Sequence, residues 1–301
     1  MPEAERSEIS YHQKQMRAVY DESREYLSKG TSLGEFDLLV SALDALSDLV
    51  PADIRSLAAG LSMPMSEAHF EFQNSFELAL LGLYRHALLT LRLVLELGVL
   101  GVFLDATDSP ESKWYFGQAP TPPFKRMLKD LNQVPGLVEF DRRFGLVSRV
   151  AELYQALGGF VHTRDFAHSA LGLSGSNFPR FVVEPLERYI ATARQSVQLI
   201  SSLTLLKYPL GMQVLPFFDK WGVDGPLGGY IDEGQVLLLG RTLPEDERDY
   251  LQSRSDLDPV VQAIRREILA MPDLTPEQLD QQFRVQRERF KVPPRARDAI
   301  A

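Results

Sequence analysis

The 301-residue chain contains no cysteine, so a disulfide framework, a thiolate zinc site and a cysteine nucleophile are all excluded. The glycine-rich phosphate loops GxxxxGK[ST] and GxGxxG are also missing, as are the HExxH and EF-hand patterns of metal sites. The five histidines are scattered, apart from His162 and His168. We therefore expect no metal site and no bound cofactor.

Positive charge is scarce, because 32 lysines and arginines face 41 acidic residues and leave a net charge of −9. Such a balance argues against a protein that coats nucleic acid through charge alone. The charge is uneven: residues 1–60 carry 11 acids against 6 bases, whereas residues 283–301 carry 6 bases against 2 acids. That basic tail either contacts phosphates or is simply a solvated terminus.

The first residues, MPEAERSEIS, lack the basic and apolar regions of a secretory signal, so we expect a cytoplasmic protein. One long apolar run exists, LYRHALLTLRLVLELGVLG at residues 83–101. Arg85, Arg92 and Glu96 within it would each cost about 2.5–3.5 kcal/mol in a bilayer. A helix buried in a soluble bundle explains this run better than a membrane span does.

The hydrophobic periodicity predicts a mainly α protein. Residues 35–50 place an apolar face on one helix, formed by Phe36, Leu39, Val40, Leu43, Leu46 and Val50. A helical pattern then runs from Ser66, a candidate N-cap, to about Leu104. Further helices are expected over residues 123–132, 136–161 and 182–208. The four segments 66–104, 123–132, 136–161 and 182–208 can form an up-down helical bundle.

Changes in composition suggest three parts. Residues 1–65 form an N-terminal helical extension, residues 66–208 the bundle, and residues 209–301 a C-terminal mixed module. The third part is rich in glycine and proline at its start and has β-like runs at residues 213–218 and 235–240. Acidic helices and the basic tail follow, and Thr275-Pro276-Glu277 is a helix-start signal.

The charged residues of the apolar run share one narrow stripe. At 100° per residue, Arg85, Arg92 and Glu96 fall within roughly 40° of one another. Because unpaired buried charges are costly, this stripe should face partners elsewhere in the chain. We expect those partners in residues 154–168, which include Tyr154 and His162. This polar cluster either fixes the register of two helices or forms a functional pocket.

Two motifs, YRHALLTLRLVLE and LYQALGGFVH, together with the order of the helices, resemble uncharacterised bacterial proteins related to the HEPN superfamily. The resemblance covers roughly residues 66–208. It implies an up-down bundle that often dimerises. Many members are metal-independent ribonucleases of toxin–antitoxin, CRISPR and phage-defence systems, and others are non-catalytic binding modules.

Catalytic members of that superfamily carry Arg, about four to six residues, then His. Here Arg164 and His168 have three residues between them, and Arg149 and His162 have twelve, so neither pair fits. The resemblance therefore implies a non-enzymatic binding or assembly protein of bacterial defence or stress, dimeric through bundle helices or bound to another protein.

The alternative is a divergent ribonuclease that acts on RNA. In it His162 or His168 would be the acid–base group, because histidine titrates near neutral pH. Arg92 or Arg164 would then stabilise charge on the phosphate.

Overall fold

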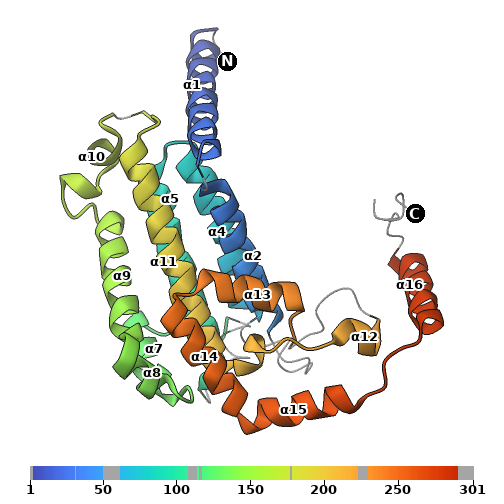
Figure 1. Ribbon diagram of the computed structural model, residues 1–301. Coiled ribbons are helices and arrows are strands. Elements are labelled where there is room, and N and C mark those ends of the chain that lie inside the picture. The colour runs from blue at the N-terminus through green and yellow to red at the C-terminus, as the bar shows by residue number, and fades with distance from the viewer. Residues whose placement is uncertain are drawn as a thin grey trace.

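The computed structural model describes residues 3–30, 32–49, 62–107, 114, 117–176, 178–222 and 230–290, and within these ranges it is helical and has no β-strand (Figure 1). The α-helices are α1 (Glu3–Ser28), α2 (Ser32–Asp48), α4 (Ser62–Leu80), α5 (Tyr84–Ala106), α7 (Phe124–Asp130), α8 (Leu137–Phe144), α9 (Leu146–Val161), α10 (Ala170–Ser174), α11 (Val183–Lys207), α12 (Phe217–Trp221), α13 (Glu233–Thr242), α14 (Glu245–Leu257), α15 (Pro259–Ala270) and α16 (Pro276–Phe290). Short 3₁₀ turns are η1 (Leu131–Gln133), η2 (Phe166–His168) and η3 (Pro209–Met212). The prediction of a mainly α protein with a helical bundle is confirmed.

Helix α5 is the centre of the bundle. It contacts α4, α11, α9 and α7, while α2 packs on both α4 and α11. Its buried residues recur at helical spacing on more than one side, including Leu88, Leu91, Leu95 and Val99. Helix α5 is long and apolar enough to cross a membrane by composition, but 67% of its apolar window is buried inside the protein. Its apolar sequence is therefore that of a helix buried in the protein core.

The expected helix over residues 66–104 is in fact two helices, which is a correction. The chain turns at Gly82, whose φ of +72° belongs to the left-handed region that favours glycine. A Cβ atom there would lie 2.6 Å from the carbonyl oxygen of Arg180. Helix α4 also begins at Ser62, so Ser66 lies inside the helix and is not its N-cap.

A second glycine divides the segment expected as one helix over residues 136–161. Gly145 has a φ of +63° and separates α8 from α9. The Asp141 carboxylate then accepts a hydrogen bond of 2.6 Å from the backbone N–H of Val147. The expected helices over 123–132 and 182–208 are confirmed by α7 with η1 and by α11.

One hydrophobic core runs through most of the molecule. Its buried members extend from Leu27 in α1 to Leu251 in α14. In α2 the predicted face is confirmed: Leu39, Leu43 and Leu46 are buried, and Phe36 and Val40 pack against them, whereas Val50 lies outside the described residues. The core thus crosses the expected boundaries at residues 65 and 209. A smaller cluster of Leu215, Phe217 and Ile268 joins α12 to α15.

The expected β-like runs are wrong. Residues 235–240 lie within α13, and residues 213–218 form a short extended connection followed by the start of α12. Asp232 and Gln235 form a capping box at the start of α13, with the Asp232 carboxylate accepting from the Gln235 N–H at 2.8 Å. This cap, together with the three-residue spacing of buried Val236 and Leu239, selects a helix. The predicted helix start at Thr275 is confirmed, because Thr275 and Gln278 hydrogen-bond reciprocally.

Candidate functional site

The charged stripe of α5 faces α9, as the sequence predicts. Arg92 donates from Nε to Glu96 Oε1 at 3.1 Å, which is the expected pair across one helical turn. Its Nη2 atom donates to the Tyr154 hydroxyl on α9, and its guanidinium carbon lies 4.1 Å from the centroid of the Tyr154 ring. Arg92 is therefore held by both a hydrogen bond and a cation–π contact.

Tyr154 is fixed from its other side by α7. Its ring stacks on Phe124 with centroids 3.8 Å apart. Burial raises the pKa of the Tyr154 hydroxyl and a hydrogen bond with Glu96 raises it further, although Arg92 acts in the opposite direction. A tyrosine in this state is a neutral donor between a carboxylate and a guanidinium. The three side chains form a brace between α5 and α9, which we call the Arg92 brace (Arg92, Glu96 and Tyr154).

Arg85 lies near the start of α5 and binds the C-terminus of α9. Its Nε donates to the carbonyl oxygen of Phe160 at 3.0 Å and its Nη2 to that of Val161 at 3.4 Å. The last carbonyls of a helix have no partner within the helix and carry partial negative charge, so an arginine there is stabilising. Arg85 therefore caps α9 and does not join the Arg92 brace.

His168 is folded back onto the same end of α9. Its Nδ1 lies 2.7 Å from Asp165 Oδ1, and its ring lies 4.8 Å from that of Phe160. The hydrogen bond with His168 lowers the pKa of the Asp165 carboxyl. A Cβ on Gly159 would approach the His168 ring to 2.4 Å, so this glycine provides the space for the histidine.

The structure does not bring His162 and Arg164 into this arrangement. Both are exposed, and His162 is the residue after the end of α9. Within the described part of the chain, no hydrogen bond or ion pair joins His162 to Arg92 or Glu96. The predicted polar cluster is thus divided between the Arg92 brace, the Arg85 cap, the Asp165–His168 pair and two exposed side chains.

A second brace was not predicted from the sequence. Glu247 of α14 is 4% exposed and binds Arg149 of α9 at 2.5 Å and the Ser202 hydroxyl of α11 at 2.7 Å. The sequence shows Glu247 only as one of three acidic residues at a helix start. Its partner is 98 residues away, so no local pattern could have indicated the pair.

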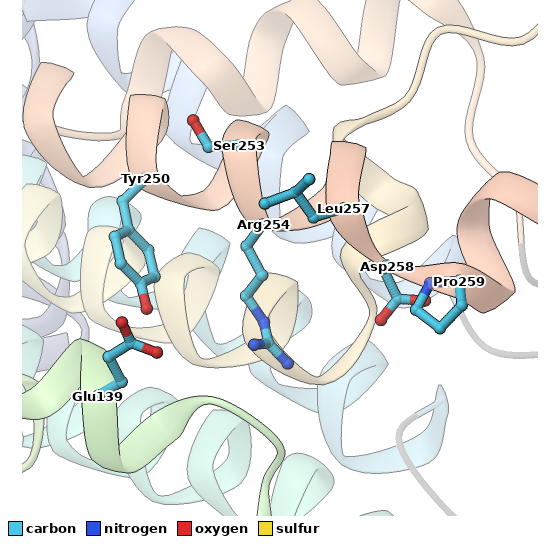
Figure 2. Close-up of a pocket in the computed structure, with 7 residues that line it drawn as sticks. All are labelled: Glu139, Tyr250, Ser253, Arg254, Leu257, Asp258 and Pro259. Carbon is cyan, nitrogen blue, oxygen red and sulfur yellow. The ribbon is translucent and has the colours of Figure 1, made fainter.

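Figure 2 shows a hollow between α8 and the junction of α14 with α15, with a volume of about 360 Å³. Tyr250 points toward the Glu139 carboxylate, and burial, followed by the charge of Glu139, raises the Tyr250 pKa. Arg254 donates from Nη2 to the carbonyl oxygen of Pro135 at 2.7 Å, and Asp258 caps α15. Arg254 Nη2 and Asp258 are thus engaged with their own chain, whereas the buried Nε of Arg254 has no hydrogen-bond partner among the described residues.

Apolar side chains are exposed at the end of the bundle where α9 ends and α11 begins. We call residues 162–182 the end lobe. Its surface and its borders expose five large apolar side chains, namely Val161 (40% exposed), Phe166 (68%), Leu171 (41%), Phe178 (58%) and Val183 (41%). A hollow of about 130 Å³ lies between the lobe and the turn from α4 to α5, lined in part by His86, Leu173 and Phe178.

Two further kinds of site were considered among the described residues, a serine nucleophile and a metal site. The stretch GTSLG at residues 30–34 has the spacing of a serine-hydrolase motif, but Ser32 is the first residue of α2 and the element before it is helix α1, whereas a nucleophile elbow joins a strand to a helix. Among the residues that the structure describes, no three His, Asp or Glu side chains converge as metal ligands.

Comparisons of the chain with protein-family models, with curated proteins and with solved structures gave no match. The functional argument therefore depends on the geometry of the chain itself. Arg85, Arg92, Glu96 and Tyr154 join helices to one another. Large apolar side chains are exposed on the end lobe and at its borders.

Proposed function

We propose that the protein is a non-enzymatic binding and assembly protein that works through the apolar surface of its end lobe. The observation that supports this proposal most strongly is the state of Arg92. Its Nε and Nη2 atoms donate to Glu96 and Tyr154, its face lies over the Tyr154 ring, and only 20% of its side chain is exposed, so these contacts hold the guanidinium between α5 and α9. An apolar surface of this kind is typical of protein interaction sites.

The cellular setting that we propose is cytoplasmic and lies in bacterial defence or stress. This part of the proposal rests on the resemblance to HEPN-related proteins. The acidic net charge of −9 and the unfitting Arg–His spacing favour a non-catalytic role within that resemblance.

A metal-independent ribonuclease is the alternative, and one observation keeps it worth testing. His162 and Arg164 are both exposed at the start of the end lobe, and no described carboxylate pairs with the Arg164 guanidinium. In this alternative His162 or His168 would transfer the proton and Arg164 would stabilise the phosphate.

The test is an incubation of purified protein with total bacterial RNA, with and without EDTA, beside the His162→Ala, His168→Ala double variant. We expect no cleavage above that of the double variant, because Arg92 is engaged and His168 is bound to Asp165. Cleavage that survives EDTA and is lost in the double variant would overturn the proposal in favour of the ribonuclease.

A further inference from the structure

The hollow between α8 and the junction of α14 with α15 (Figure 2) has the size of a small-molecule site. Its volume of about 360 Å³ falls within the range of about 300–1,000 Å³ that is usual for ligand pockets. In Figure 1, α8 lies at the opposite end of the bundle from α10, which belongs to the end lobe. The proposed function therefore makes no use of this hollow.

One wall of the hollow is apolar. Leu257 at the end of α14 lines it and is 82% exposed, more than any other large apolar side chain that the structure describes. The Tyr250 ring and Pro259 line the hollow as well. Ligand pockets combine such apolar surfaces with a few polar groups that fix the orientation of the ligand.

Arg254 brings donors without acceptors to the hollow. Its guanidinium packs against Gly136, where a Cβ atom would lie 2.2 Å from Nη1, so the glycine provides the space for this side chain. Its Nη2 donates to the carbonyl oxygen of Pro135 at 2.7 Å, whereas the buried Nε has no partner in the described part of the chain. An unsatisfied donor of this kind is unfavourable, so an acceptor on a ligand would be favourable here.

Arg143 of α8 adds a second positive charge beside the hollow. Its guanidinium carbon lies 5.0 Å from the centroid of the Phe144 ring and 5.7 Å from that of Tyr250. Arg143 and Arg254 both act electrostatically on the Tyr250 hydroxyl. No carboxylate among the described residues forms an ion pair with either arginine.

The two carboxylates at the hollow, in contrast, already have donors. Asp258 accepts hydrogen bonds from the backbone N–H groups of Val260 at 2.9 Å and Val261 at 3.1 Å. The Glu139 carboxylate accepts one from the Tyr250 hydroxyl. The unused capacity of the hollow is therefore that of its guanidinium groups, which pair best with carboxylate or phosphate.

We propose that this hollow binds a small organic anion. The carboxylate or phosphate of the ligand would lie at Arg143 and Arg254, and its apolar part would lie against Leu257 and the Tyr250 ring. This inference goes beyond the proposed function and does not depend on it, because the hollow and the end lobe lie at opposite ends of the bundle.

The first test compares four probes that share a phenyl ring: benzoate, phenyl phosphate, benzylamine and benzyl alcohol. Binding to the full chain is measured by titration in saturation-transfer NMR. We expect at least one of the two anions to bind at least about tenfold more tightly than the amine and the alcohol. The tighter anion then identifies the preferred headgroup. Equal binding of all four probes, or binding of none, would overturn the inference.

The second test repeats the titration of the tighter anion with variants. Arg143→Gln and Arg254→Gln should each weaken binding at least about tenfold. Leu257→Ala should weaken it about threefold, and this exposed side chain can be shortened without disturbing the core. Arg142→Gln is the matched control, because Arg142 is exposed on the same helix and does not line the hollow.

Circular dichroism would check that each variant is folded. An affinity unchanged by both Arg143→Gln and Leu257→Ala would overturn the inference. An equal loss in Arg142→Gln and Arg143→Gln would also overturn it, because the anion would then respond only to the general surface charge.

Discussion

At the scale of single residues, Tyr154 is the side chain on which the polar interior of the bundle depends. It receives Arg92, stacks on Phe124 and hydrogen-bonds with Glu96, so three helices meet at one ring. Arg92 and Glu96 are only partly exposed, at 20% and 35% of their side chains, which makes the hydrogen bonds stronger than those of a fully solvated pair. The structure therefore supports the interpretation that these residues fix the register of two helices.

Tyr154→Phe tests this brace. The change removes the hydroxyl that joins the guanidinium and the carboxylate but keeps the ring on Phe124. We expect the free energy of unfolding to fall by about 1–2 kcal/mol, measured by urea denaturation. Tyr11→Phe is the control, because this exposed hydroxyl should contribute less than about 0.5 kcal/mol. An equal effect of the two substitutions would contradict the brace.

At the scale of the elements, the sequence predicts where helices exist better than where they end. The apolar pattern locates α11 within one residue at each end, and Thr275 locates the start of α16. The break at Gly82 was missed because one glycine inside an apolar run is compatible with a continuous helix. What requires the turn is the backbone of Arg180, nearly 100 residues away, which no local pattern records.

Gly82→Ala tests the turn between α4 and α5. Alanine would be strained at a φ of +72° and would also meet the Arg180 backbone at 2.6 Å. Gly117→Ala is a matched control, since Gly117 has a φ of +68° and nothing within 4 Å of the added Cβ. We expect a loss of about 1 kcal/mol for Gly117→Ala and at least about 2 kcal/mol more for Gly82→Ala. Equal losses in chemical denaturation would show that the close approach is unimportant.

The C-terminus of α2 provides a prediction on pH. Burial raises the pKa of Asp48, and the nearby charges of Asp44 and Asp232 raise it too, although a hydrogen bond from Gln235 opposes them. A carboxyl group whose pKa is higher in the folded state destabilises the protein once it is ionised, and this penalty vanishes as the pH falls below the unfolded value of 3.8.

Asp48→Asn keeps an acceptor for Gln235 and removes the charge. We expect the variant to be more stable than the wild-type protein by about 0.5 kcal/mol at pH 7, because a negative charge is unfavourable at a helix C-terminus. The gain should disappear near pH 3, which urea denaturation at both pH values would show. Asp37→Asn, at an exposed position of the same helix, should give no such gain. A gain that persists at pH 3 would contradict this explanation.

At the scale of the whole molecule, sequence reasoning predicted a helical bundle and the pairing of α5 with α9. It did not predict the exposed surface of the end lobe. An apolar residue such as Phe166 or Phe178 has the same appearance in a sequence whether it is buried or exposed, and only the folded chain shows these two to be 68% and 58% exposed. The sequence also does not record where α9 ends. His162 was therefore expected beside Arg92, although it follows the last residue of α9 and is exposed to solvent.

The central claim is that the protein acts through the surface at this end of the bundle. The incubation with total bacterial RNA in the presence of EDTA tests the non-enzymatic part of this claim most directly, beside the His162→Ala, His168→Ala double variant. We expect no cleavage above that of the double variant, because Glu96 and Tyr154 hold Arg92 and Asp165 holds His168. Cleavage that survives EDTA and is lost in the double variant would contradict the account.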